Sequence, residues 1–139
     1  MCRFMSMPTI ANGSCGRDRA SSSGTAKRWL TPDTTLIRGG GHFTGSSMLH
    51  WAGGASGRGI VCCSDTAYVA TDCRHVTFMR SYPNYVPLPA ERVKAIANAL
   101  APFAFEKMFG NFFESVIETG AKQAFSRSVE RYLAAIASR

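Results

Sequence analysis

The spacing of hydrophobic residues changes along the chain. From residue 34 to residue 79 the apolar residues form short runs separated by glycine-rich or polar segments, a pattern typical of strands. We predict strands at 34–38, 47–52, 60–63, 66–70 and 76–79. In the second of these, Met48 and His50 should face one side of a sheet and Leu49 and Trp51 the other.

The strand at Ile60–Cys63 has no polar position, and we expect it to be buried on both faces. The segment from Tyr82 to Pro89 contains three prolines, which cannot donate to a strand ladder, so it should be an irregular loop.

After Pro89 the period becomes helical. Val93, Ile96, Ala97 and Leu100 stand at i, i+3, i+4 and i+7, which predicts a helix over 90–100. Residues 103–109 alternate as in a last strand. Helical spacing then returns over 120–138, through Phe125, Val129, Tyr132, Leu133 and Ile136.

Residues 1–33 are rich in serine, glycine and arginine and have little periodicity, so we expect a loosely ordered segment. The folded part is then 34–139, an α/β domain of mostly strands followed by helix, strand and helix. The abrupt change near residue 33 also fits a mis-started or disrupted reading frame.

Composition fits one soluble domain: the chain has 139 residues, of which 45% are hydrophobic and 18% charged. No apolar run reaches the roughly 18 residues of a membrane span, and no apolar stretch follows the N-terminal charge as in a signal peptide. We therefore predict a cytoplasmic protein without membrane contact. The five cysteines, odd in number and without a Cys-x-x-Cys spacing, are expected to be buried free thiols.

The net charge of +7 would favour contact with nucleic acid or acidic surfaces. The basic residues are scattered, however, and the longest run is the pair Lys27-Arg28. This distribution argues against a nucleic-acid surface, although a non-enzymatic basic binding module, contacting nucleic acid or a partner chain, remains the alternative function.

Two residues could bind a metal. His42 follows a predicted strand and lies among glycines that allow a sharp turn, so its imidazole should point into a cleft. Asp65 ends an apolar strand, where a buried carboxylate needs a cation or hydrogen-bond donors. Both side chains are zinc ligands in proteins, and together they form a partial site.

Two segments resemble regions of metallo-β-lactamase-fold hydrolases. The first is similar to their Gly-His-x-x-Gly region and reads Thr35-Leu36-Ile37-Arg38-Gly39-Gly40-Gly41-His42-Phe43-Thr44-Gly45-Ser46-Ser47-Met48-Leu49-His50-Trp51. Val61-Cys62-Cys63-Ser64-Asp65-Thr66 resembles the later strand whose Gly-Asp aspartate bridges two metals. The resemblance implies that His42 is a terminal zinc ligand and Asp65 the bridging one. It also implies that residues 34–138 correspond to the second half of an αββα sandwich, whose intact relatives hydrolyse ester, amide or thioester-type bonds of small molecules through zinc-bound hydroxide.

The chain departs from this family at three places. No histidine precedes His42, so the His-x-His-x-Asp-His cluster is absent. Gly110-Asn111-Phe112 stands where the family has its last histidine, and Ser64 replaces the usual glycine. A catalytic zinc site uses three protein ligands and a water. We therefore expect a truncated or degenerate metallo-hydrolase-like protein that binds zinc weakly or not at all, with no assigned catalytic residue.

Each candidate also has a structural interpretation. The backbone could satisfy His42, and Asp65 could cap the following turn through backbone amides. His50 should be a packed strand residue and His75 a solvent-exposed turn residue. The aromatic residues Phe109, Phe112 and Phe113 should cover the core rather than build a substrate pocket.

Half of a sandwich should leave one sheet face without cover. We predict that Met48, Val61 and Phe105 lie on that face. The chain should then self-associate or bind a partner that supplies the missing half.

Overall fold

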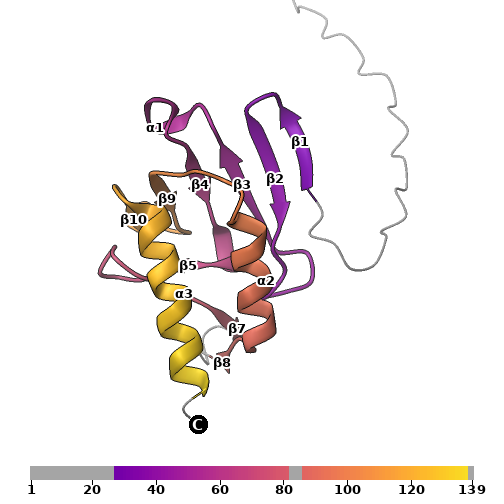
Figure 1. The fold of residues 1–139 in the computed structure, drawn as a ribbon, viewed down its shortest axis with the longest axis vertical. Coiled ribbons are helices and arrows are strands. Elements are labelled where there is room, and N and C mark those ends of the chain that lie inside the picture. Colours follow the sequence, from indigo (N-terminus) through magenta and orange to yellow (C-terminus); the bar gives the residue numbers. More distant parts are fainter. Residues whose placement is uncertain (1–26, 82–85, 138–139) are drawn as a thin grey trace, which may run out of the picture.

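The computed structural model describes residues 27–81 and 86–137 (Figure 1). It is a mixed α/β fold, as the spacing predicts. The elements, in chain order, are β1 (Lys27–Thr31), β2 (Thr34–Arg38), β3 (Ser47–Trp51), α1 (Gly54–Gly57), β4 (Ile60–Cys62), the 3-10 turn η1 (Ser64–Thr66), β5 (Tyr68–Val69), β6 (Val76–Thr77), β7 (Met79–Ser81), β8 (Val86–Pro87), α2 (Ala90–Leu100), β9 (Lys107–Phe109), β10 (Val116–Ile117) and α3 (Ala121–Ala137).

The main sheet has six strands in the order β1-β2-β3-β4-β9-β10. All neighbouring pairs are antiparallel except β4 and β9, which are parallel. Strands β2, β4 and β9 therefore run in the same direction, and the loops that follow them leave the same end of the sheet. Two small sheets, β5-β6 and β7-β8, complete the described part of the chain.

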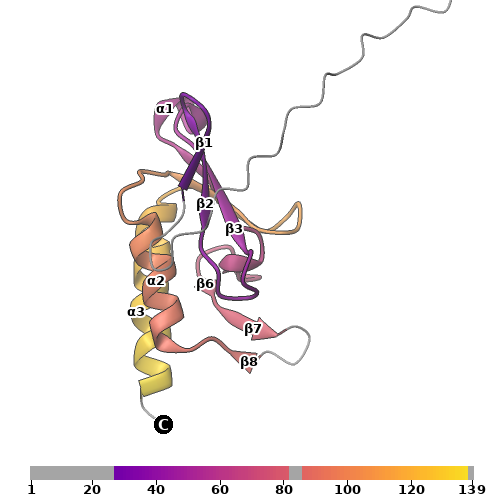
Figure 2. The ribbon, with the colours of Figure 1, turned by 90° about the vertical axis from the view of Figure 1, so that its right-hand side faces the viewer.

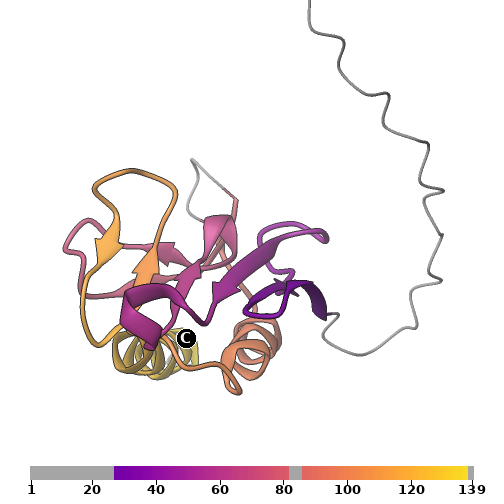
Figure 3. The same cartoon turned by 90° about the horizontal axis from the view of Figure 1, so that it is seen from above.

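Both long helices lie on one side of the main sheet (Figures 2 and 3). The side chains that point toward the helices are buried and come from alternating strand positions: Thr35, Ile37, Met48, His50, Val61 and Met108. Neither α2 nor α3 covers the opposite side (Figure 3), where Leu36, Leu49, Ile60 and Phe109 are half-buried and Trp51 and Cys62 are exposed. One side of the sheet is thus a closed core, and the other is open.

The faces differ from our expectation. Met48, Val61 and Phe105 are 0%, 0% and 3% exposed, so they belong to the covered core rather than to the open side. Alternation assigns residues to two faces, but it does not show which face receives the helices. Strand Ile60–Cys62 is also not buried on both sides, because Cys62 is exposed.

The helices α2 and α3 confirm the predicted spacing. Val93, Ile96 and Leu100 of α2 are fully buried, and Phe125 of α3 packs edge-to-face on Phe78 and Phe105. Lys122 of α3 donates three hydrogen bonds, of 2.7 to 2.9 Å, to the carbonyls of Leu100, Ala101 and Phe103. Leu100 and Ala101 lie at the end of α2, where carbonyls lack partners within the helix, so Lys122 joins the start of α3 to the end of α2.

Several short elements differ from the prediction. We expected a loop up to residue 33, but Lys27–Thr31 pairs with β2, and every residue of this edge strand is exposed. Residues 1–26 and 82–85 lie outside the described residues. The predicted strand at 103–109 is reduced to Lys107–Phe109, and the two-residue β10 was not predicted.

Proline enters a strand at Val86–Pro87, within the predicted loop, where a two-stranded edge tolerates it. In the described residues, no helix is long and apolar enough to cross a membrane.

Candidate functional site

The loops that follow β2, β4 and β9, here called the strand-end loops, place His42, Asp65 and Asn111 at one end of the main sheet. His42 follows β2, Asp65 follows β4 and Asn111 follows β9, and these strands run in the same direction. The strand register aligns four residues across the sheet, Leu36, Leu49, Cys62 and Phe109. The three loops therefore begin at similar positions along the strand direction.

Asp65 lies in η1 and meets the loop after β9. The Asn111 side-chain amide donates a hydrogen bond to Oδ1 of Asp65. The strand ends below this contact are joined as well, because the Cys63 backbone N–H and thiol both donate to the Phe109 carbonyl, at 2.9 and 3.0 Å. In the described residues, the partner of the Asp65 carboxylate is therefore a side chain 46 positions away rather than an amide of its own turn.

Ser64, the residue before Asp65, has a φ of 46°. This left-handed conformation costs a residue with a Cβ atom about 1–2 kcal/mol and costs glycine almost nothing. The backbone before Asp65 thus has the shape that a Gly-Asp pair allows, with serine in the strained position.

His42 is held by a glycine turn and a backbone carbonyl. Gly40 and Gly41 have φ values of 61° and 92°, and a Cβ atom on Gly41 would lie 2.9 Å from Cδ1 of Ile96. Glycine therefore permits both the turn and the close approach to α2. Nδ1 of His42 donates to the Met79 carbonyl at 3.1 Å, which places the proton of the neutral ring on Nδ1 and leaves Nε2 as the acceptor.

The hydrogen bond of His42 fits both of its interpretations. A backbone carbonyl satisfies the ring, as in an ordinary loop histidine. The same bond is also the usual outer contact of a histidine that ligates metal, because it fixes the ring and its tautomer.

The metal-ligating set is not complete within the part of the chain that the structure describes. No three His, Cys, Asp or Glu side chains come together there, and no hydrogen bond joins His42 to Asp65. The residues present therefore do not fit a stable zinc site, for which three or four protein ligands are needed.

The other two histidines have structural roles. His50 is 6% exposed, donates a hydrogen bond to the Ala104 carbonyl at 2.9 Å and packs against the tilted Phe103 ring, which confirms the packed strand residue. His75 is half-buried rather than fully exposed, and its Nδ1 lies 2.5 Å from Oδ2 of Asp72. Hydrogen bonds from the Arg74 backbone N–H, and then from His75, lower the pKa of Asp72 to about 2.

Not all of the cysteines are buried. Cys63 is buried, Cys73 is half-buried and Cys62 is exposed on the open side of the sheet, while Cys2 and Cys15 lie outside the described residues. Burial raises the pKa of the Cys63 thiol to about 12, so it remains a hydrogen-bond donor rather than a nucleophile at neutral pH.

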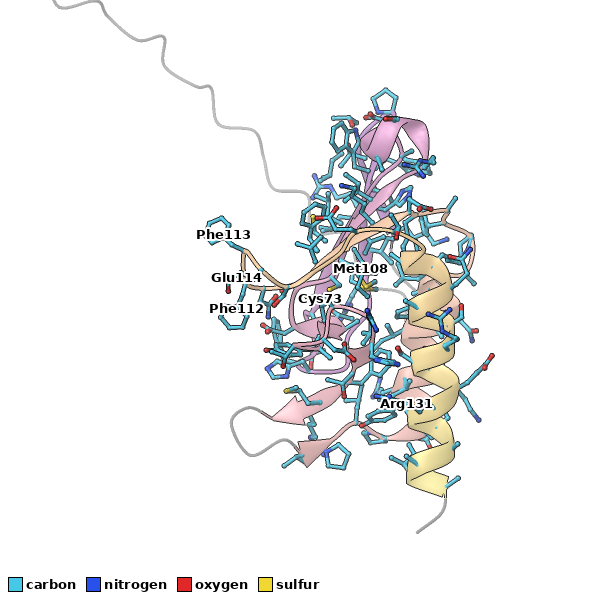
Figure 4. All side chains as sticks on the ribbon, turned by 90° about the vertical axis from the view of Figure 1, so that its left-hand side faces the viewer. Cys73, Met108, Phe112, Phe113, Glu114 and Arg131 are labelled. Carbon is cyan, nitrogen blue, oxygen red and sulfur yellow. The ribbon has the colours of Figure 1, made fainter. Side chains whose placement is uncertain are left out.

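The aromatic residues after β9 do not cover the core. Phe112 is 58% exposed and Phe113 is fully exposed at 104%. Figure 4 shows both side chains on a loop that projects away from α3, together with Glu114. Our expectation for Phe112 and Phe113 was wrong, whereas Phe109 is half-buried in the sheet.

One surface groove lies away from the strand-end loops. It has a volume of about 540 Å³ and none of His42, Asp65 and Asn111 lines it. It is lined by Pro87, Leu88, Pro89, Ala90, Lys94, Leu133, Ile136 and Ala137.

The chain is similar to the uncharacterized protein YmaE of Bacillus subtilis (strain 168). The two are 40% identical over 109 residues, which is 78% of this chain and 39% of YmaE. The chain thus spans about two fifths of the length of this relative. No protein-family model and no solved structure matches the chain.

The sequence predicts His42 and Asp65 as candidate ligands but does not predict the contact that Asn111 makes with Asp65. The only signal for Asn111 is the resemblance stated above, in which this position corresponds to a histidine. Thr66, next to Asp65, was also missed: it is 1% exposed and its hydroxyl has no hydrogen-bond partner in the described residues.

Proposed function

We propose that this chain is a truncated or degenerate metallo-hydrolase-like protein that has kept two metal ligands, His42 and Asp65, of a metallo-β-lactamase-type site. Its sheet, covered by helices on one side only, would correspond to the second half of an αββα sandwich. Intact relatives of this kind hydrolyse ester, amide or thioester-type bonds, with zinc lowering the pKa of water and polarising the scissile carbonyl.

The contact between Asn111 and Asp65 supports this proposal most strongly. Asn111 occupies the place of the family's last histidine ligand, and its side chain meets the residue proposed as the bridging ligand. A chance resemblance of short motifs would not require these two positions, 46 residues apart, to touch.

The backbone supports the same conclusion. The conformation of Ser64 is one that glycine adopts freely, as at the family's Gly-Asp pair. The bond from Nδ1 of His42 to Met79 leaves Nε2 free for a ligand role.

The proposed activity of this chain on its own is therefore background hydrolysis only. Two ligands do not hold zinc in the manner of a catalytic site, and a second copy of the chain would add no histidine cluster. A partner chain, or a further part of a longer protein, would have to supply those residues.

The test restores one ligand at the position that the geometry indicates. Asn111→His should tighten zinc binding at least tenfold relative to the unmodified chain, measured by competition with a chromophoric chelator. The added imidazole would lie beside Asp65, and a third ligand converts a partial site into a usable one.

Two further variants make this result specific. His42→Ala in the Asn111→His background should return the zinc affinity to the level of the unmodified chain. Asn98→His adds a histidine at an exposed position of α2 and should have no effect. Equal affinities for all of these proteins would show that the strand-end loops do not form a metal site.

A further inference from the structure

The open side of the main sheet has an apolar centre. The residues that face it alternate with the buried core positions: Leu36, Leu49, Trp51, Ile60, Cys62 and Phe109. Leu36, Leu49, Cys62 and Phe109 form one continuous row across four strands, because each is aligned with the next. We call these six residues the open face.

Charged residues border the open face on its β1–β2 side. Arg38 is exposed and has the same parity as Leu36, so it points to the open side. Arg28 is aligned with Leu36 and is also exposed. Apart from the bond from its Nε to the Thr44 carbonyl, at 3.1 Å, the Arg38 side chain has no hydrogen-bond partner in the described residues.

Aromatic and acidic residues border it on the β9–β10 side. The loop from Gly110 to Ser115, here called the aromatic loop, carries Phe112, Phe113 and Glu114, and it projects to the side opposite the helices (Figures 2 and 4). Its two phenylalanines are among the most exposed large apolar residues of the described chain.

The size of this surface fits a dimer interface. The six strands, two to five residues long, outline a face of roughly 350–400 Å² at about 3.4 Å per residue and a strand spacing of about 4.8 Å. Each aromatic side chain of the loop can add on the order of 150 Å². The sum, roughly 650–700 Å², lies somewhat below the roughly 800 Å² that each partner contributes to a standard protein interface.

The arrangement of the two borders is self-complementary. A two-fold axis parallel to the strands, passing between β3 and β4, places β1 and β2 of one copy opposite β10 and β9 of the other. Because Phe109 is aligned with Leu36, the aromatic loop that begins after Phe109 lies level with Arg38. Each aromatic loop then meets the arginines of the other copy, where Phe112 and Phe113 can stack on guanidinium groups and Glu114 can pair with Arg38.

We propose that the open face is the interface of a two-fold symmetric homodimer, in which the aromatic loop of each copy packs against Arg28 and Arg38 of its partner. A two-fold axis perpendicular to the strands would instead place β1 on β1 and bring like charges together. The second copy would take the place that the missing half of the sandwich has in the proposed function. The dimer itself does not use the metal ligands, since none of these residues is His42, Asp65 or Asn111.

Sedimentation equilibrium of the full chain under reducing conditions tests the assembly. The chain of 15.0 kDa should sediment as a species of twice that mass, about 30 kDa, at micromolar concentration. Leu49→Asp, in the centre of the open face, should weaken the dimer at least 100-fold. Val86→Asp places the same charge on an apolar residue that is 41% exposed and lies outside the open face, and it should leave the dimer intact.

A charge exchange tests the pairing between copies. Arg38→Glu alone should weaken dimerisation about tenfold, and the double variant Arg38→Glu/Glu114→Arg should recover most of that loss. The recovery also excludes misfolding as the cause of the first effect, because a misfolded chain would not be repaired by a second surface substitution.

Cys62 reports directly on the coverage of the open face. A short bis-maleimide should link two copies through Cys62, close to the proposed axis, and Cys62→Ser should abolish that link. A chain that is monomeric at 100 µM would overturn the proposal. This holds both if Cys62 reacts freely with the maleimide and if another segment or a different partner protects it. A dimer that is insensitive to Leu49→Asp would overturn it as well.

Discussion

Replacing Ser64 with glycine should stabilise the protein, although it removes a side chain. The φ of 46° at Ser64 costs a serine about 1–2 kcal/mol, and glycine avoids this cost. Glycine loses more conformational entropy on folding, about 0.5–1 kcal/mol, which offsets part of the gain. The Ser64 side chain is exposed and has no hydrogen-bond partner in the described residues, so no packing is lost. The expected net gain is therefore about 0–1.5 kcal/mol, with a central value of about 0.7 kcal/mol.

Equilibrium unfolding in urea measures this gain. The protein concentration is held fixed, so that the extent of self-association is the same for both proteins. The midpoint should rise with an unchanged slope, because the unfolded state exposes the same surface. Thermal unfolding should shift upward by about 3–6 °C.

A matched substitution reverses the sign. Ser126 lies at an exposed position of helix α3, and Ser126→Gly should destabilise the protein by about 0.5 kcal/mol because glycine is a poor helix former. A decrease in stability for Ser64→Gly, or equal effects of the two substitutions, would refute the left-handed strain at Ser64.

Two further variants test interactions outside the strand-end loops. Asp72 has a lowered pKa, so its contribution to stability is present above the unfolded-state pKa of about 3.8 and is lost as the pH falls toward about 2. The free energy of unfolding, measured in urea at pH 5 and pH 2.5, should therefore differ less between the two pH values in Asp72→Asn than in the unmodified chain. Ser128 is 1% exposed and its hydroxyl accepts from the Val76 N–H and donates to the Ala124 carbonyl. Ser128→Ala should cost about 1–3 kcal/mol in urea unfolding, because the Val76 N–H would be left buried and unpaired, and a cost near zero would show that water replaces the hydroxyl.

The regular elements could be predicted where the sequence has a strong period. Helix α2 begins and ends at the predicted residues, and β2 and β3 follow their alternation. Strand β1 could not be predicted, because all five of its residues are exposed and an edge strand with no buried face has no alternation. The two-residue β10 is too short to have a period at all.

The candidate site was predictable only in part. His42 and Asp65 have local signals, glycines in one case and an apolar strand in the other. The contact of Asn111 with Asp65 depends on β9 pairing in parallel with β4 across a long crossover, which no local pattern specifies. For the same reason, no local pattern shows which face of the sheet the helices cover.

The metal content of the purified chain tests the central claim most directly. Elemental analysis after dialysis against trace zinc should find well below one zinc per chain, since His42 and Asp65 supply two ligands where stable sites use three or four. One tightly bound zinc per chain, lost in His42→Ala and in Asp65→Asn, would contradict the account of a degenerate site.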